Sequence, residues 1–355
     1  MRDFYCQCGN TLFFRNTRCL QCDRRVGFAP GAGRMTALEP LGGGLWQVPG
    51  AGRIQGAVYR LCDNATRHAI CNWLIPEATP HAQCQSCRLT RTLPDLDQPR
   101  HAELWGKLES AKRHLLFNLM QLGLPIVDRR QDPEAGLAFD FLADRDSTTE
   151  FTRPIAGQAP VNTGHANGVI TINIAEADDV ARARMREQMG EHYRTLLGHF
   201  RHEIGHYYWS RLVADGGPLA ACRTLFGDDR ADYAAALKRY YRDGAPGDWQ
   251  ARFITPYASA HPWEDWAETW AHYLHMRDTL ETAVEFSLVT PPPWRHAADD
   301  FDALMHGWTQ LAIGMNAVNR SMGLPDAYPF VISGPTHEKL AFIHCLVADH
   351  ESAAA

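Results

Sequence analysis

The chain has 355 residues, of which 45% are hydrophobic and 21% are charged, as in an ordinary globular protein. Its net charge of −6 excludes an overall basic field that would attract nucleic acid. No stretch approaches the roughly 18 to 20 apolar residues of a membrane span, and the N-terminal MRDFYCQCGN lacks a signal-peptide core. We therefore expect a soluble cytoplasmic protein without membrane association, and the length predicts two domains.

Residues 1–95 form a cysteine-rich region that shows almost no helical periodicity. Without a secretion signal, clustered cysteines favour metal binding over disulfides. Tight CxC and CxxC turns bring thiolates to one tetrahedral zinc, so we expect two structural four-cysteine sites. The first comprises Cys6, Cys8, Cys19 and Cys22, and the second comprises Cys62, Cys71, Cys84 and Cys87. Which cysteines share an ion stays open, because the short cysteine turns can pair across the intervening loops. A set of reduced core cysteines without metal is the alternative. A redox CxxC is disfavoured, because no thioredoxin-like context surrounds either pair.

The sequence PDLDQP at residues 94–99 marks the boundary to a second domain at residues 96–355. Leucines on one face predict a long helix from His101 that ends at Gly123. Alternation predicts strands at residues 137–144 and 168–178, followed by helix over 178–214. Two further helices are expected at residues 262–276 and 335–349. The fold class is therefore α+β, with a mostly α-helical second domain that contains a small β-sheet.

The expected helix over residues 178–214 contains the motif His202-Glu203-x-x-His206. Positions i and i+4 share one helix face, so both imidazoles can bind one zinc ion. Glu203 cannot easily reach that metal, but it can take a proton from a zinc-bound water, whose pKa falls to about 7. The 17 histidines of the chain also allow a chance match, so the motif needs a third ligand from elsewhere.

The best source of a third ligand is the helix expected at residues 262–276. Glu264, Glu268 and His272 follow one another at intervals of four, beside a stripe of aromatic residues. Buried acidic groups are costly unless a cation or hydrogen-bond donors face them. We assign Glu264 as the ligand and Glu268 as the acceptor of a hydrogen bond from a ligating histidine. The reverse assignment, in which Glu268 binds zinc and His272 supports it, stays open. A third alternative is that these residues form a solvated acidic helix face without a metal.

HExxH followed by EDWAETW resembles the glutamate-zincin metallopeptidases, which include thermolysin and anthrax lethal factor. In the lethal-factor type the first glutamate of this second motif binds zinc. Nearly the whole chain is similar to bacterial zinc-binding metallopeptidases with an N-terminal zinc ribbon. The shared motifs are FFRNTRCLQC, CNWLIP, CQSCRLTRTLPDL, GVITINIAEAD, LLGHFRHEIGHYYW, EDWAETWAHYLH and NRSMGLPDAYPF. The resemblance implies a zincin-like metallopeptidase domain, although the CxC at Cys6 is tighter than the usual CxxC.

The resemblance also implies roles for residues outside the two motifs. An edge strand at the cleft of such enzymes pairs with the extended substrate, and here it corresponds to Gly168, Val169 and Ile170. Tyr257, seven residues before Glu264, corresponds to a tyrosine that stabilises the oxyanion, although an ordinary loop aromatic is the alternative. His199 and His261 are interpreted as surface or capping residues.

Together these features predict a zinc endopeptidase that hydrolyses peptide bonds with a zinc-activated water and Glu203 as general base. Each chain would hold about three zinc ions, one catalytic and two structural. The alternative is a zinc-ribbon binding protein whose peptidase-like domain is latent or acts on a single partner. The ribbon also contains four arginines that could bind nucleic acid: Arg15, Arg18, Arg24 and Arg25. Such binding is disfavoured, because the chain is acidic and lacks interleaved aromatic and basic residues.

Overall fold

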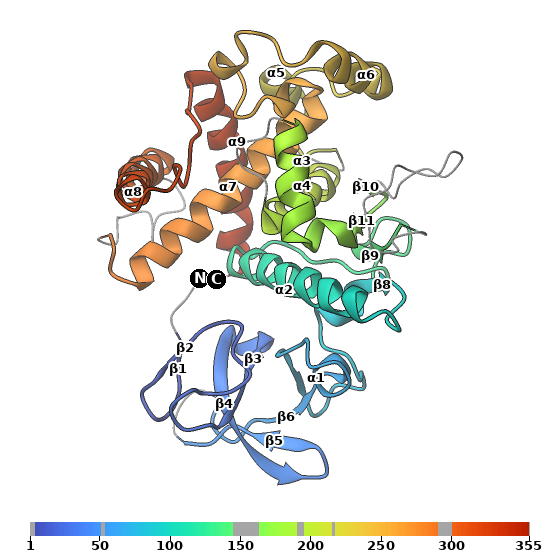
Figure 1. The fold of residues 1–355 in the computed structure, drawn as a ribbon, viewed down its shortest axis with the longest axis vertical. Coiled ribbons are helices and arrows are strands. Elements are labelled where there is room, and N and C mark those ends of the chain that lie inside the picture. Colours follow the sequence, from blue (N-terminus) through green and yellow to red (C-terminus); the bar gives the residue numbers. More distant parts are fainter. Residues whose placement is uncertain are drawn as a thin grey trace. The chain divides into compact units, whose positions relative to one another are not determined.

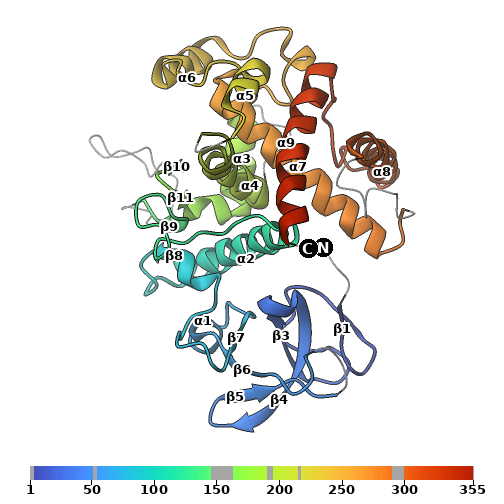
Figure 2. The same cartoon turned by 180° about the vertical axis from the view of Figure 1, so that it is seen from behind.

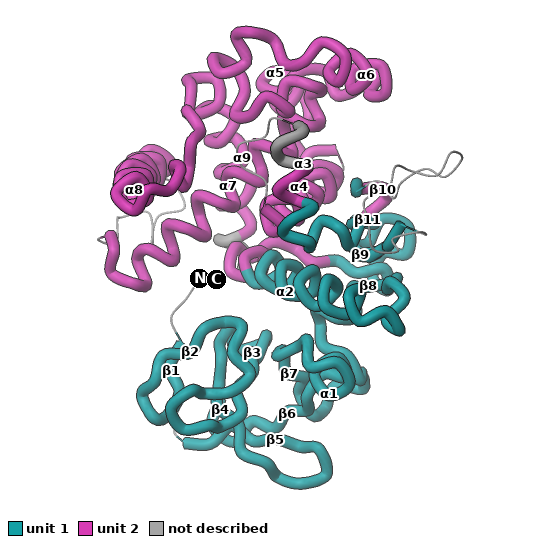
Figure 3. The backbone as a smooth tube through the Cα atoms, viewed as in Figure 1, with its two compact units in different colours: residues 1–117, 127–164, 169–181 teal, residues 118–126, 165–168, 182–355 magenta. Residues whose placement is uncertain are grey.

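The computed structural model describes residues 4–50, 54–144, 163–189, 195–214, 217–289 and 300–354. The fold is α+β, as expected: a cysteine-rich ribbon with small sheets precedes a mostly helical domain with a small mixed sheet. The chain forms two compact units (Figure 3). Unit 1 comprises Met1–Phe117, Val127–Gly164 and Val169–Ala181, and unit 2 comprises Asn118–Ile126, His165–Gly168 and Arg182–Ala355. Unit 1 thus continues past residue 95, where the sequence predicts the domain boundary.

The ribbon consists of a short hairpin and a five-stranded antiparallel sheet. The hairpin pairs β1 (Phe4–Tyr5) with β2 (Thr11–Leu12). The sheet has the strands in chain order: β3 (Arg25–Ala29), β4 (Arg34–Gly42), β5 (Leu45–Gln47), β6 (Val58–Leu61) and β7 (Leu74–Pro76). Gly43 and Gly44 have φ of 60° and 80° in the turn between β4 and β5, a conformation that favours glycine. The Gly-rich segment therefore makes hairpin turns inside a sheet.

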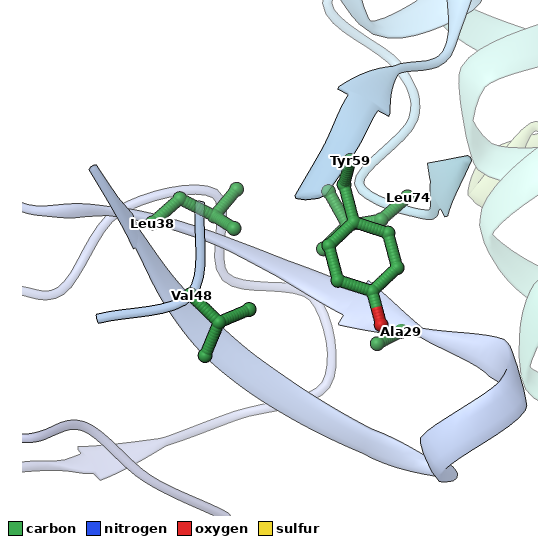
Figure 4. Close-up of a cluster of buried hydrophobic side chains, with 5 residues drawn as sticks. All are labelled: Ala29, Leu38, Val48, Tyr59 and Leu74. Carbon is green, nitrogen blue, oxygen red and sulfur yellow. The ribbon is translucent and has the colours of Figure 1, made fainter. Parts of the chain in front are cut away.

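A small apolar core fills one side of this sheet. Figure 4 shows its five members, Ala29, Leu38, Val48, Tyr59 and Leu74. A second cluster is aromatic and includes Phe117 of α2 (Pro99–Gln121), a helix that confirms the one expected from the leucine pattern. The ring centroid of Phe117 lies 4.9 Å from that of Phe14 and 5.5 Å from that of Phe28. The ribbon therefore gains apolar burial from α2 that its own thin core could not supply.

A four-stranded mixed sheet follows, with the strand order β10-β11-β9-β8. Its members are β8 (Thr90–Thr92), β9 (Ala138–Leu142), β10 (Gly164–Ala166) and β11 (Val169–Asn173). Ile170 and Ile172 are fully buried, as the alternating pattern predicts. However, β11 lies between β10 and β9, so both of its edges are paired. Among the described residues, the strand that follows Gly168 and contains Val169 and Ile170 therefore has no open edge, and β10 forms that edge of the sheet.

The single helix expected over residues 178–214 is divided into α3 (Asp179–Met189) and α4 (Leu196–Tyr208). Thr195 is extended and caps α4, because its hydroxyl accepts a hydrogen bond of 2.9 Å from the Gly198 N–H. A π-helical turn at Trp209–Ala214 continues α4. Residues 190–194 lie outside the described residues. The HExxH motif thus occupies a short helix with its own N-cap.

A one-turn helix, α1 (Asp63–Thr66), lies in the ribbon, and the other remaining α-helices belong to unit 2. They are α5 (Leu219–Phe226), α6 (Tyr233–Asp243), α7 (Pro262–Glu285), α8 (Phe301–Ser321) and α9 (Gly334–Ala354). Figures 1 and 2 show α4, α8 and α9 gathered around α7. The helix expected at 262–276 is therefore longer than predicted, and it forms the centre of this unit. Within the described residues, none of the helices is both long and apolar enough to cross a membrane.

Candidate metal centres and active site

The two helices that carry the motif residues approach each other at Gly205 of α4. A Cβ atom at this position would lie 3.1 Å from the Ala267 Cα and 3.2 Å from the Trp270 Cβ on α7. Trp266 of α7 also donates its indole N–H to the Gly205 carbonyl oxygen across 2.8 Å. The close packing of α4 on α7 thus depends on a glycine inside the HExxH motif. It brings the face of α4 that carries the histidines against the face of α7 that carries the glutamates.

His202, His206 and Glu264 form a buried group whose ligand atoms all lie within 4.8 Å of one another. His202 Nε2 lies 3.0 Å from Glu264 Oε2, and His206 Nε2 lies 3.7 Å from Glu264 Oε1. Ligands of a tetrahedral zinc, with bonds of about 2.0 to 2.1 Å, are separated by about 3.3 Å. Among the residues that the structure describes, the buried Glu264 Oε2 has no hydrogen-bond partner. Both the spacing and the orphaned oxygen fit a zinc ion.

Glu268 lies behind His202 and not in this group. Its Oε1 lies 2.6 Å from His202 Nδ1, and its Oε2 accepts a hydrogen bond of 2.6 Å from the Thr255 hydroxyl. The Nδ1 contact places the imidazole proton on that nitrogen and leaves the Nε2 lone pair for a metal. His272 instead pairs with the hydroxyl of Tyr328 at 2.7 Å. The geometry thus favours Glu264 as the ligand over the reverse assignment.

The charges of the group also suit a cation. Burial by itself raises the pKa of Glu264 and of Glu268, but the neighbouring His202 lowers both to about 2. Burial lowers the pKa of His206 to about 3. Burial also opposes protonation of His202, yet the two carboxylates beside it raise its pKa. Two ionised carboxylates therefore face one neutral imidazole and one that can be charged, which favours binding of a divalent cation.

Two tyrosine side chains adjoin the group. Tyr233, the first residue of α6, donates its hydroxyl to Glu264 Oε1 across 2.6 Å. The ring centroid of Tyr257 lies 6.0 Å from that of His202. Burial, together with the charge of Glu264, raises the pKa of both phenols, so both are protonated donors. Tyr257 is expected from the resemblance, whereas Tyr233 is not, because no spacing connects Tyr233 to either motif.

Glu203 is buried on α4, next to His202. Its negative charge contributes to the raised pKa of Tyr233, after burial and the contributions of Glu264. Glu203 thus directly follows the first candidate ligand along α4. This position is compatible with the expected role of Glu203 as a proton acceptor.

Two further rings, those of Trp263 and His165, pack beside His206. The ring centroid of Trp263 lies 4.1 Å from that of His206. His165 of β10 lies nearly parallel to His206, with centroids 6.3 Å apart. The Gly168 N–H donates to His165 Nε2 across 3.1 Å, and burial lowers the pKa of His165 to about 4, so this imidazole is neutral. His165 was not expected at this site, although the following Asn167-Gly168 is a strong hairpin signal.

His261 is the N-cap of α7, which confirms its interpretation as a capping residue. Its Nδ1 accepts a hydrogen bond of 3.1 Å from the Trp263 N–H. The Nε2 atom then carries the proton, which it donates to the Ala231 carbonyl oxygen across 3.0 Å. His261 therefore joins the segment before α6 to the start of the helix that carries Glu264.

The ribbon cysteines form two groups, and within each group all sulfur atoms lie within 4.8 Å of one another. The first group comprises Cys6, Cys8, Cys19 and Cys22, and the second comprises Cys62, Cys71, Cys84 and Cys87. The sulfurs of Cys6 and Cys22, like those of Cys8 and Cys19, are 3.6 Å apart. In the second group the sulfur of Cys71 lies 3.7 Å from those of Cys84 and Cys87. Thiolates around a tetrahedral zinc, with bonds of about 2.3 Å, are separated by about 3.8 Å. Both groups fit zinc, and the CxC turn does not prevent convergence.

The knuckle at Cys19 also favours a thiolate. Although burial acts to raise its pKa, backbone N–H groups of Cys22 and Gln21 help to lower the pKa of Cys19 to about 6. Zinc binds thiolates and not thiols. All ten cysteines of the chain are free, so none of the eight is withheld from metal by a disulfide.

Comparison with known proteins agrees with both kinds of site. Residues 101–346 match the family described as "Putative zinc-binding metallo-peptidase", and residues 3–98 match a zinc-ribbon domain. Uncharacterized proteins of Mycobacterium bovis and Mycobacterium tuberculosis are 43% identical to the chain over 355 residues, which cover 98% of this chain and 95% of theirs. No solved structure matches the chain significantly. The chain therefore belongs to this family of zinc-binding metallo-peptidases and carries an N-terminal zinc-ribbon domain.

Proposed function

We propose that this protein is a zinc-dependent endopeptidase whose metal is held by His202, His206 and Glu264. The observation that carries the proposal is the buried His-His-Glu group, in which Glu268 orients His202 from behind. Three protein ligands leave a fourth coordination position open, as in catalytic rather than structural zinc sites. The four-cysteine groups of the ribbon have no such open position, and we assign them to structural zinc.

In the proposed reaction each of these side chains has a separate role. A zinc ion bound here would act as a Lewis acid and lower the pKa of a water molecule to about 7. Glu203 takes the proton from the attacking water and transfers it to the leaving nitrogen. Tyr257 donates a hydrogen bond to the oxyanion as the carbonyl carbon becomes tetrahedral. Glu268 holds the His202 ring in the tautomer that the site requires.

Membership of the family supports a peptide substrate. The residues support the same class, because β10 is the edge strand of its sheet and carries His165 beside His206. An extended peptide that pairs with β10 would be held through its backbone, without a demand on its sequence. We therefore propose β10 as the substrate strand in place of β11.

Incubation with unfolded casein tests the proposal. We expect the zinc-loaded protein to cleave casein, and Glu203→Gln to retain its zinc but lose cleavage by about 100-fold or more, because removal of a general base typically costs about 10²- to 10⁴-fold. Glu338→Gln, which changes an exposed glutamate of α9, is the matched control and should cleave like the wild type. Equal cleavage by Glu203→Gln would contradict the mechanism. Intact casein with a fully zinc-loaded wild type would favour a latent or single-partner protein instead.

A further inference from the structure

The two oxygens of the Glu264 carboxylate have different surroundings. Oε2 lies 3.0 Å from His202 Nε2 and has no hydrogen-bond partner among the described residues. Oε1 accepts a hydrogen bond of 2.6 Å from the Tyr233 hydroxyl. One oxygen is thus engaged by the protein, and the other faces the histidines with its lone pairs unused. This is the arrangement expected of a carboxylate that binds a metal through a single oxygen.

Tyr233 is itself held in place from the helix that carries Glu264. His261, the N-cap of α7, donates a hydrogen bond to the carbonyl oxygen of Ala231, two residues before Tyr233. The ring of Tyr233 contacts the rings of His261 and Trp263, with centroid distances of 5.2 Å and 5.8 Å. The phenol therefore reaches Glu264 from a fixed backbone and not from a freely moving side chain.

We propose that Tyr233 is a positioning residue for the metal: its hydroxyl fixes the Glu264 carboxylate with Oε2 directed at the ion. This inference rests on the His-His-Glu zinc site of the proposed function. A glutamate without such a partner can rotate about its side-chain torsions, and binding the metal then costs the entropy of selecting one orientation. Loss of an outer hydrogen-bond partner of a ligand typically weakens metal binding by about 10- to 100-fold.

Tyr233→Phe is the informative substitution, because it removes only the hydroxyl and keeps the ring that packs on His261 and Trp263. Zinc per chain would be measured by elemental analysis at a series of buffered free-zinc concentrations. His202→Ala/His206→Ala defines the level at which only the ribbon is occupied. We expect half-occupancy of the third zinc in Tyr233→Phe to require about 10- to 100-fold more free zinc than in the wild type. Tyr241→Phe, on the same helix but with Tyr241 62% exposed, should bind like the wild type.

A second measurement separates positioning from a general contribution to the fold. Thermal unfolding of the zinc-depleted proteins should give nearly the same midpoint for Tyr233→Phe and the wild type. A large fall in that midpoint would overturn the positioning role, because the hydroxyl would then act on stability and not on the metal. Unchanged zinc occupancy in Tyr233→Phe would overturn it as well.

These outcomes are distinct from failure of the proposed function. Zinc occupancy is measured without any substrate, so a protein that binds the third zinc but does not cleave casein still tests Tyr233. If the wild type never binds a third zinc, the proposed function and this inference both fail. If it does bind a third zinc and Tyr233→Phe binds it equally well, only the inference fails.

Discussion

His202 Nδ1 lies 2.6 Å from Glu268 Oε1, and this contact decides which ring nitrogen is available to a metal. When the single proton of the neutral ring is on Nδ1, the Nε2 atom, which lies 3.0 Å from Glu264 Oε2, can bind a metal. Glu268 is itself fixed by the Thr255 hydroxyl. One glutamate of the second motif therefore belongs to the candidate ligand set and the other supports it.

Glu268→Gln tests this division of roles. An amide accepts a hydrogen bond less strongly than a carboxylate, so His202 would be less well oriented and less basic. We expect zinc affinity of the third site to fall by about 10- to 100-fold, whereas Glu264→Ala should abolish zinc binding there. Elemental analysis of the dialysed variants gives the zinc content. If Glu264→Ala kept the third zinc and Glu268→Ala lost it, the reverse assignment would hold.

Gly205 offers a second test, because its lack of a side chain allows α4 to pack against α7. A Cβ atom at Gly205 would approach the Ala267 Cα to 3.1 Å, and backbone cannot move aside cheaply. We expect Gly205→Ala to destabilise the protein by about 1 to 3 kcal/mol through overpacking, and to weaken zinc binding as the two helices separate. Chemical denaturation measures the first effect, and zinc titration the second.

Gly314 of α8 is the matched control for this substitution. A Cβ atom at Gly314 would have no heavy atom within 4 Å. Gly314→Ala should therefore leave stability unchanged or raise it by about 0.5 to 1 kcal/mol, through better helix propensity alone. If both alanine variants behaved alike, close packing at Gly205 would not be what positions the two helices.

A buried ion pair also connects the two helices. Arg201 of α4 and Asp278 of α7 are separated by 2.6 Å, and both are buried. Asn118 joins the pair, because it contacts both side chains. Asp278→Asn would leave the guanidinium buried without its counter-charge, so we expect a loss of about 3 to 5 kcal/mol in unfolding free energy.

The comparison for this substitution is the ion pair between Arg320 of α8 and Asp326, which follows that helix. Arg320 and Asp326 are also 2.6 Å apart, but the Arg320 side chain is 67% exposed. Asp326→Asn should therefore cost no more than about 1 kcal/mol. Denaturant titration of the zinc-loaded variants measures both losses. Similar losses in the two variants would show that burial of the Arg201–Asp278 pair has no special effect.

His272 should make stability depend on pH. Burial lowers its pKa from the ordinary 6.5 to about 4, although the charge of Glu268 acts in the opposite direction. Between these values the unfolded chain binds a proton that the native protein excludes, so the free energy of unfolding decreases as the pH falls from 6.5 towards 4. The contribution is on the order of 3 kcal/mol over that range.

His272→Gln should remove this contribution and make the stability profile flatter than that of the wild type. Both proteins keep the same zinc ligands, so the difference between their profiles isolates His272 from acid release of zinc. Denaturant titrations at several pH values between 5 and 7 provide the measurement. Parallel profiles would mean that His272 does not titrate differently in the two states.

The candidate metal ligands could be predicted from the sequence because each set follows a local rule. Helical spacing places His202 and His206 on one face, and short knuckles bring the cysteines together. Glu264 and Glu268 followed from their spacing within one helix. The α+β class and the ribbon also followed from local patterns, because hydrophobic periodicity and cysteine clusters are properties of short segments.

The sequence was less informative about contacts between distant segments. Tyr233 reaches Glu264 only because His261 anchors the segment before α6, and no sequence interval encodes that contact. The sequence favoured the segment of β11 over that of β10, because β11 has the more regular alternation, whereas β10 is three residues long and carries little pattern. The Asn167-Gly168 pair could have predicted the hairpin, because Asn-Gly is preferred in two-residue turns where both residues have positive φ. Both residues do have positive φ in the structure.

The most direct test of the account is the mapping of newly formed peptide ends in a cell lysate. Wild type and Glu203→Gln, matched for zinc content, would be incubated with the same lysate and the new N-termini identified by mass spectrometry. We expect internal cleavage sites in the wild-type sample that are absent with Glu203→Gln and with chelator-treated protein. The same sites in all samples, or none with a fully zinc-loaded wild type, would contradict the claim that this site hydrolyses peptide bonds.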